Sequence, residues 1–138
     1  MPSTRCIPTF QNTFPRLLES ELIATNIFSS FFHGVSLRGD TCKIQIGGKT
    51  IIQDNTILVN SNKNDSDSIM TIGDRVVIGV NCRLDVCTIE DNVYIGNGAT
   101  IHRGCLIQSG AMIAPGAVIL PNTIVPMNQV INLIFYIN

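Results

Sequence analysis

Aliphatic residues recur every six positions along most of this chain, a spacing that matches neither a helix nor an alternating strand. The series begins at Ile46, stops after Leu58 and resumes at Ile72. It takes one step of five, from Leu84 to Ile89, and then returns to sixes. The aliphatic positions of the series are Ile46, Ile52, Leu58, Ile72, Ile78, Leu84, Ile89, Ile95, Ile101, Ile107, Ile113, Ile119 and Val125.

A small or β-branched residue follows many of these aliphatic residues by four positions: Thr50, Thr56, Val76, Cys82, Val93, Ala99, Cys105, Ala111, Ala117 and Thr123. Two inward-facing residues in every six, with short strands and sharp corners, predict triangular coils of about eighteen residues. Gly and Asn tolerate the positive φ of such corners, which places corners at Gly98, Gly104, Gly110, Gly116 and Asn122. The pattern predicts an all-β fold, a left-handed parallel β-helix of roughly four to five coils.

Irregular extensions are expected on both sides of the repeat. The predicted organisation is an N-terminal extension over 1–30, a β-helix domain over 31–127 and an apolar C-terminal tail over 128–138. The polar segment NSNKNDSD (60–67) interrupts the spacing and predicts a loop at a corner. Residues 1–18 carry two arginines and no acid, which fits either an organelle transit peptide or an arm that packs on partners.

Composition limits the functions to consider. With 138 residues the chain suffices for one domain, and its net charge of −1 gives no bulk attraction for nucleic acid. Hydrophobic residues make up 45% of the chain, yet no apolar run is long enough to predict a membrane span. We therefore expect the apolar side chains to be buried internally or against partners. The cysteines form no CxxC pair and are expected to be reduced, buried thiols: Cys6, Cys42, Cys82, Cys87 and Cys105.

Three stretches carry a family resemblance. They are FFHGVSLRGD (31–40), IQIGGKTIIQDNTIL (44–58) and TIGDRVVIGVNCRLDVCTIEDNVYIGNGATI (71–101). Together with GAMIAPGAVILPNTIVP, this pattern resembles the gamma-class carbonic anhydrases over about residues 31–127. The hexapeptide repeat alone is unspecific, because many acyltransferases share it. The LRGD and QD motifs at this spacing are more specific.

The resemblance implies a metal site whose ligands this chain lacks. The family binds its catalytic metal with three histidines contributed from both sides of a trimer interface. The corresponding residues here are Val59, Val80 and Asp85. Because neutral imidazoles make the metal-bound water acidic enough to react near neutral pH, this chain is expected to bind no metal or other cofactor and to be no enzyme.

Further site residues are assigned by the same resemblance. Arg38 and Asp40 match a pair that crosses the trimer boundary, although a local corner salt bridge is the alternative. Gln53 and Asp54 match residues that line the family's site, and without a metal we expect a structural role, with Asp54 accepting corner N–H bonds. Asp85 is expected either to line a remnant pocket or to form a solvated pair with Arg83.

The two histidines fall outside the metal positions. Hexapeptide acyltransferases use a histidine as general base, so His33 and His102 are candidates for that role. The simpler expectation is that His102 is a surface residue. His33 replaces an aromatic of the family's pattern, which favours a packing role.

The resemblance predicts a non-catalytic structural subunit of mitochondrial respiratory complex I. Such a chain is expected to belong to a trimer, or heterotrimer, of gamma carbonic anhydrase-like chains on the matrix side of the inner membrane. It would contact membrane-arm subunits without spanning the bilayer and would bind no nucleic acid. The alternatives are a hexapeptide acyltransferase and a β-helix subunit of another assembly, such as dynactin.

Overall fold

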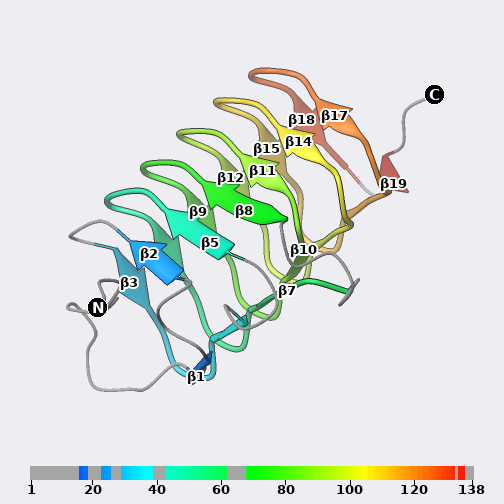
Figure 1. Cartoon of the computed structure of the whole chain (residues 1–138). Coiled ribbons are helices and arrows are strands. Elements are labelled where there is room, and N and C mark those ends of the chain that lie inside the picture. The colour runs from blue at the N-terminus through cyan, green and yellow to red at the C-terminus, as the bar shows by residue number, and fades with distance from the viewer. Residues whose placement is uncertain are drawn as a thin grey trace.

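The protein folds into a triangular prism of short parallel strands (Figure 1). The structure is a computed structural model that describes residues 16–18, 23–25, 29–38, 43–61, 68–132 and 134–135, with backbone only for Arg38 and for the strands 16–18, 23–25 and 134–135. These residues form three sheets, here named A, B and C, of seven, six and six strands. Successive strands of the chain enter the sheets in the order A, B, C, so every third strand returns to the same sheet.

The strands are short because each one spans a single face of the prism. Sheet A contains β1 (Arg16–Leu18), β4 (Ser36–Arg38), β7 (Ile57–Val59), β10 (Arg83–Asp85), β13 (Thr100–Ile101), β16 (Val118–Ile119) and β19 (Ile134–Phe135). Sheet B contains β2 (Ile23–Thr25), β5 (Lys43–Ile46), β8 (Ile69–Ile72), β11 (Thr88–Ile89), β14 (Leu106–Ile107) and β17 (Ile124–Val125). Sheet C contains β3 (Ser30–Phe31), β6 (Ile51–Ile52), β9 (Val77–Ile78), β12 (Tyr94–Ile95), β15 (Met112–Ile113) and β18 (Val130–Ile131).

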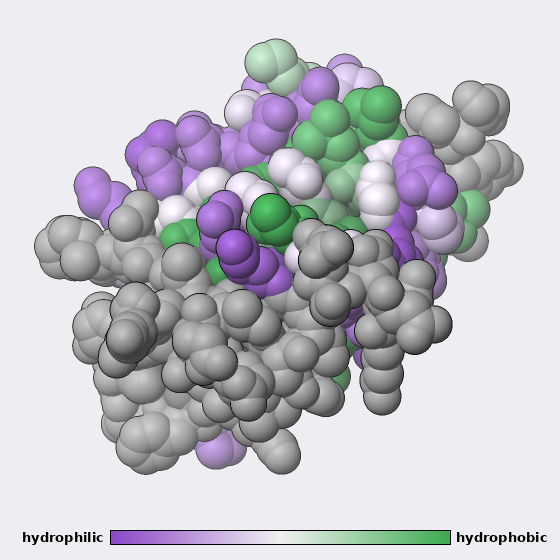
Figure 2. Space-filling view, in the orientation of Figure 1, coloured by the Kyte–Doolittle hydropathy of each residue, from purple (hydrophilic) through white to green (hydrophobic). Residues whose placement is uncertain are grey.

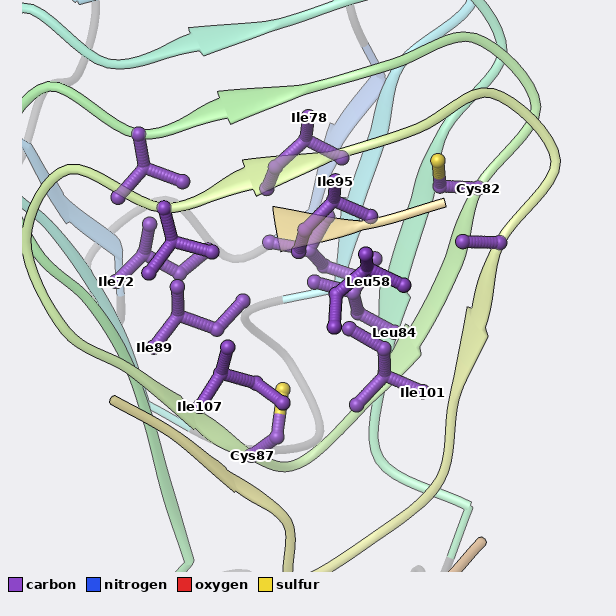
Figure 3. Close-up of a cluster of buried hydrophobic side chains, with 14 of the residues drawn as sticks. Leu58, Ile72, Ile78, Cys82, Leu84, Cys87, Ile89, Ile95, Ile101 and Ile107 are labelled. Atoms are coloured by element: carbon purple, nitrogen blue, oxygen red, sulfur yellow. The ribbon is translucent and has the colours of Figure 1, made fainter. Parts of the chain in front are cut away.

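The parallel β-helix predicted from the six-residue spacing is confirmed. From Ile46 to Ile119, each aliphatic residue of the series pairs with the corresponding residue of the next coil, as Ile78 does with Ile95 and Ile95 with Ile113. All thirteen members of the series are at most 3% exposed, and the small residues four positions later are also buried. Figure 3 shows aliphatic residues of the series, together with Cys82, pointing into the narrow interior from all three faces. Burial of this column is the main stabilising contribution, at roughly 25 cal/mol per Å² of apolar surface.

The solenoid is longer than the sequence predicts. Six strands in each of sheets B and C correspond to six stacked coils in the described chain, more than the four to five expected. Strands β1 and β2 lie within the predicted N-terminal extension, and β18 and β19 lie within the predicted tail. Parallel pairing needs only an extended backbone, so a segment can join the ladder without showing the aliphatic spacing. Within the described residues the fold contains no helix that is long and apolar enough to cross a membrane.

The corners use a left-handed backbone at a fixed position. Positive φ occurs at twelve described residues, each the second residue of a two-residue turn: Gly34, Lys49, Asn55, Arg75, Asn81, Asn92, Gly98, Gly104, Gly110, Gly116, Asn122 and Asn128. The five corners predicted from Gly and Asn are confirmed. Lys49 and Arg75 adopt the same conformation, which is unfavourable for residues with a long side chain.

Acidic side chains connect successive coils at the corner between sheets B and C, the B–C edge. Gly48 N donates to Asp74 Oδ1 (2.8 Å), and Asp74 N donates to Asp91 Oδ1 (2.7 Å). One coil further, Ser109 N donates to Glu90 Oε1 (3.0 Å). Each acid therefore accepts a backbone N–H from a neighbouring coil, and the bonds continue along this edge.

Candidate functional site

The residues at the lost ligand positions lie on the two edges that bound sheet A. Val59 ends β7 and Asp85 ends β10, and the two residues are register partners at the A–B edge. Val80 lies in the turn between β9 and β10, at the C–A edge. Strand β10 thus crosses the face of sheet A between Val80 and Asp85.

The three positions cannot meet within one chain. Val80 lies in the turn before β10 and Asp85 ends that strand, so β10 separates the two residues across one face of the prism. Val59 and Asp85 share one edge, whereas Val80 lies at the other. Convergence of the three positions would require the A–B edge of one subunit to meet the C–A edge of another.

Asp85 is buried, and its Oδ1 atom contacts three neighbours. Its side chain is 10% exposed, and its Oδ1 accepts hydrogen bonds from Ser61 N (3.0 Å) and Val86 N (2.9 Å). The same oxygen lies 3.7 Å from Arg103 Nη1 in the next coil. The expectation of a solvated pair between Asp85 and Arg83 is therefore wrong: Arg83 is exposed, and the cation beside Asp85 is Arg103.

The shape of the A–B edge explains this arrangement. The five-residue step shortens the corner after β10 to Val86 and Cys87, with no left-handed residue. This turns the Asp85 carboxylate into the corner, where it reaches Ser61 at the base of the inserted segment. Arg83 lies at the start of β10, two positions before Asp85, and is exposed.

Arg103 and Asn60 complete a polar cluster across three coils. Arg103 Nη1 donates to Asn60 Oδ1 at 2.6 Å, and the two residues are 43 positions apart in the chain. Asn60 is 3% exposed, so its side chain is held inside the corner, although the sequence predicts a loop from residue 60. The loop prediction for 62–67 lies outside the described residues. The sequence analysis missed both Arg103 and Asn60. The available signal was the short step at residue 85 beside the insertion after Asn60.

The environment of Asp85 favours its charged form. Burial alone would raise the pKa of the carboxyl, but hydrogen bonds from the Ser61 side chain and backbone, the Val86 N–H and the charge of Arg103 outweigh it. The pKa of Asp85 is therefore held below its ordinary value of 3.8. At neutral pH the carboxylate is a hydrogen-bond acceptor and an ion-pair partner.

Gln53 and Asp54 lie beside Val80 at the C–A edge, and both are half-buried. The Asp54 carbonyl accepts a bond from Asn81 N at 2.9 Å. Its carboxylate accepts no hydrogen bond from any described residue, so the corner acids that act in the expected way are Asp74 and Asp91 instead. Arg38 ends β4 in the coil before Val59, at the A–B edge, and Asp40 lies outside the described residues.

The histidines are separate from each other. His33 is exposed in the turn between β3 and β4, where its carbonyl accepts from Asn55 N (3.0 Å), so the expected packing role is not seen within this chain. His102 is half-buried and follows β13. The pairing of Leu84 with Ile101 makes His102 the neighbour of Asp85 across the coils, but among the described residues no hydrogen bond joins these side chains.

Three cysteines are buried in the interior, as expected: Cys82, Cys87 and Cys105. Cys82 Sγ donates to Gly96 O and Cys105 Sγ donates to Leu120 O, each at 3.1 Å. Burial raises the pKa of both thiols. They are small interior residues rather than nucleophiles. Cys6 and Cys42 lie outside the described residues.

The residues at the three lost ligand positions do not fit a metal ion. Val59 and Val80 carry no donor atom, and Asp85 Oδ1 is committed to two backbone N–H groups and Arg103. Over the described ranges no group of three His, Cys, Asp or Glu side chains is arranged to hold a metal. The cluster of Asp85, Arg103 and Asn60 instead connects three coils at one corner.

Sequence comparisons agree with the hexapeptide repeat. Residues 70–103 match the family model described as bacterial transferase hexapeptide (six repeats). Gamma carbonic anhydrase 3, mitochondrial, of Arabidopsis thaliana is 43% identical over 74 residues, 52% of this chain and 29% of that protein. A probable carbonic anhydrase of Methanocaldococcus jannaschii is 40% identical over 74 residues, 54% of this chain and 44% of its own. The matched stretch thus spans less than half the length of these relatives.

Structural comparison supports the fold. An acetyltransferase-like structure from Bacillus cereus has a TM-score of 0.63 at 23% identity, covering 86% of this chain and 72% of its own. A hexapeptide-repeat acetyltransferase from Vibrio cholerae has a TM-score of 0.55 at 23% identity, covering 75% and 68%. At this level of identity the likeness concerns the left-handed parallel β-helix alone.

Proposed function

We propose that this chain, a gamma carbonic anhydrase-like protein, is a non-catalytic structural subunit of mitochondrial respiratory complex I. It would act as one member of a trimer of gamma carbonic anhydrase-like chains on the matrix side of the inner membrane. There it would support the assembly and stability of the membrane arm.

The observation that carries the non-catalytic part is the state of Asp85. A remnant ligand would keep its oxygens available in an open site, yet this carboxylate is buried and bonded to Ser61, Val86 and Arg103. With two valines at the other ligand positions, this chain offers no group to hold a metal-bound hydroxide. The carboxylate has a role in stability in place of a role in catalysis.

The positions of the site residues support assembly with related chains. Val59 and Asp85 lie at one edge of sheet A, and Val80 at the other. A chain of this kind would present two edges to two neighbours, as the resemblance implies for a trimer. Placement in mitochondria is supported by the Arabidopsis relatives, which are named as mitochondrial proteins.

The deciding experiment is a native gel of mitochondrial membranes from the source cells, with mass spectrometry of the bands. Peptides of this chain are expected in the band that carries NADH dehydrogenase activity, together with other gamma carbonic anhydrase-like chains. Their absence from that band, with the chain detected elsewhere, overturns the complex I assignment.

A second measurement tests the absence of catalysis separately. The purified chain is expected to contain no stoichiometric zinc, iron or cobalt by elemental analysis and not to accelerate CO2 hydration. Stoichiometric metal together with CO2 hydration activity would overturn the non-catalytic role. Membership of complex I would still be decided by the native gel.

A further inference from the structure

The chain contains a single Asn-Gly pair, Asn97–Gly98, at a corner of the C–A edge. Both residues are exposed, and they form the two-residue turn between β12 and β13. An asparagine followed by glycine is especially open to deamidation, because glycine has no side chain to shield its backbone nitrogen from the asparagine amide. Whether this corner reacts therefore depends on how the fold holds the two residues.

Deamidation needs the backbone nitrogen of Gly98 to reach the side-chain carbon of Asn97. Gly98 N, after losing its proton to water or hydroxide, attacks Asn97 Cγ, and the new C–N bond closes a ring. The Cγ–Nδ2 bond then breaks, and Nδ2 takes up a proton and leaves as ammonia. Water opens the resulting succinimide at either carbonyl, which gives aspartate or isoaspartate, and no oxidant or reductant takes part.

The folded corner holds both reacting groups in other contacts. Gly98 N donates to Val80 O at 2.8 Å, and Asn97 Oδ1 accepts from Val80 N at 2.9 Å. The turn is closed by Ala99 N, which donates to Gly96 O at 3.3 Å. One residue of the preceding coil, Val80, thus binds the attacking N–H group and the asparagine side chain at the same time.

The backbone conformation of the turn opposes the reaction as well. Gly98 is the second turn residue and has a φ of 73°, whereas Asn97 is not among the residues with positive φ. This combination is that of a type II turn, in which the first turn residue has a ψ of about +120°. At that angle the Gly98 nitrogen is rotated away from the Asn97 side chain, so ring closure requires the turn to open.

From this geometry we propose that Asn97 is a deamidation site that stays closed while its coil is stacked on Val80. Separation of the two coils breaks both hydrogen bonds, frees the backbone of the turn and allows the reaction. The rate at Asn97 is then the rate of the unfolded chain multiplied by the fraction of time that the corner is open. The inference rests on hydrogen bonds within one chain and is independent of the proposed function.

The two products have different effects on the corner. Aspartate keeps an acceptor for Val80 N, and the B–C edge already uses this arrangement, because Asp74 and Asp91 accept N–H bonds at its corners. Figure 2 shows hydrophilic surface along those corners. Isoaspartate instead routes the backbone through the former side chain, which lengthens the turn by one methylene and removes the group that reached Val80 N. We therefore expect aspartate at position 97 to be tolerated and isoaspartate to weaken the corner.

The test uses two glycine substitutions that make the same local contacts at different edges. A Cβ on Gly79 would overlap Asn97 Oδ1 and lie 2.9 Å from Asn97 N, so Gly79→Ala pushes this side chain away from Val80 N. A Cβ on Gly73 would overlap Asp91 Oδ1 and lie 3.0 Å from Asp91 N at the B–C edge. Gly73→Ala is therefore the matched control, since it strains its corner in the same way and does not touch Asn97.

Deamidation at Asn97 is measured by peptide mass spectrometry after incubation of the purified full chain in mildly alkaline buffer, with and without urea. The folded chain is expected to react at least about tenfold more slowly than the chain in urea. Gly79→Ala should raise the folded-state rate about fivefold or more, whereas Gly73→Ala should leave it within about twofold. Asn97→Asp reproduces the aspartate product and is expected to keep the circular dichroism spectrum of the folded chain.

Each comparison has an outcome that overturns the proposal. Equal rates in the folded chain and in urea do so, as does an Asn97 that is unreactive in urea. Equal folded-state rates for Gly79→Ala and Gly73→Ala assign the protection to global stability and remove the role of Val80. If circular dichroism shows that Gly79→Ala is unfolded, hydrogen exchange of the Gly98 amide in the unsubstituted chain decides instead, and an unprotected amide overturns the proposal.

Discussion

The B–C edge and the A–B edge of the prism are built from the same repeat, yet only one of them is regular. At the B–C edge, each corner has a left-handed second residue, from Lys49 to Asn128, and acids accept N–H bonds from neighbouring coils. At the A–B edge, one corner contains the insertion after Asn60 and the next is shortened to Val86 and Cys87.

The difference shows two ways to hold stacked coils together. Where the six-residue spacing is regular, the repeated corner conformation and hydrogen bonds from backbone N–H groups to Asp and Glu side chains of neighbouring coils hold the coils together. Where the spacing fails, a cluster of side chains from three coils takes over, centred on Asp85 and Arg103. In this chain the irregular edge is also the edge at which two of the three lost ligand positions lie.

The largest expected effect comes from removing the cluster at the irregular edge. Asp85→Leu leaves the Ser61 and Val86 N–H groups without their acceptor and Arg103 without its counter-charge, and is expected to lower the free energy of unfolding by about 3 kcal/mol. Urea unfolding followed by circular dichroism measures this loss. The control Arg83→Ala, on the same strand but exposed, should stay within about 0.5 kcal/mol. Equal losses of unfolding free energy for the two substitutions would contradict the stabilising role of the Asp85 cluster.

A smaller effect is expected from closing the space at the regular edge. A Cβ on Gly47 would lie 2.2 Å from Asp74 Oδ1 and 2.6 Å from the Gly73 backbone carbon, so Gly47→Ala should cost about 2 kcal/mol. Gly116→Ala is the matched control, because nothing lies within 4 Å of its added Cβ and only its φ of 74° is unfavourable. That control should cost about 1 kcal/mol. Thermal unfolding of both variants tests the order, and a larger loss for Gly116→Ala would contradict it.

The smallest effect is a pH dependence confined to the irregular edge. The folded-state pKa of Asp85 lies below the ordinary value of 3.8, so its stabilising contribution is complete above that value and is lost as pH falls through the lower, folded pKa. The stability difference between the unsubstituted chain and Asp85→Asn should be constant from about pH 7 to pH 5 and shrink below 3.8. Urea midpoints across this range measure it. A difference that grows in acid would mean that the sign of the shift is wrong.

Much of the fold could be predicted because its determinants are local. The spacing alone identifies each inward residue, such as Ile78 or Ile95. Gly and Asn indicate corners because they tolerate a positive φ. Lys49 and Arg75 hold the same conformation but were not predicted, since their residue types do not favour it. At these corners the bonds of neighbouring coils impose the backbone.

The site was only partly predictable for a different reason. The resemblance located Val59, Val80 and Asp85, but the partner of Asp85 could not be read from the sequence. Arg83 is near Asp85 in the chain, whereas Arg103 is near it only after a full coil has formed. The bond between Arg103 and Asn60 joins residues 43 positions apart. The short step at residue 85 beside the insertion marks this corner as irregular, but it does not identify the two residues that pair there.

The insertion at the A–B edge also bears on how this scaffold can be altered. Ile46 pairs with Ile72, 26 residues later, whereas Ile72 pairs with Ile89 only 17 residues later, and both pairs keep the same register. The length of chain in a coil is therefore free to vary, provided that the extra residues leave and return at one corner. Such a corner is a natural place to graft a foreign peptide, displayed at a known height on a rigid column.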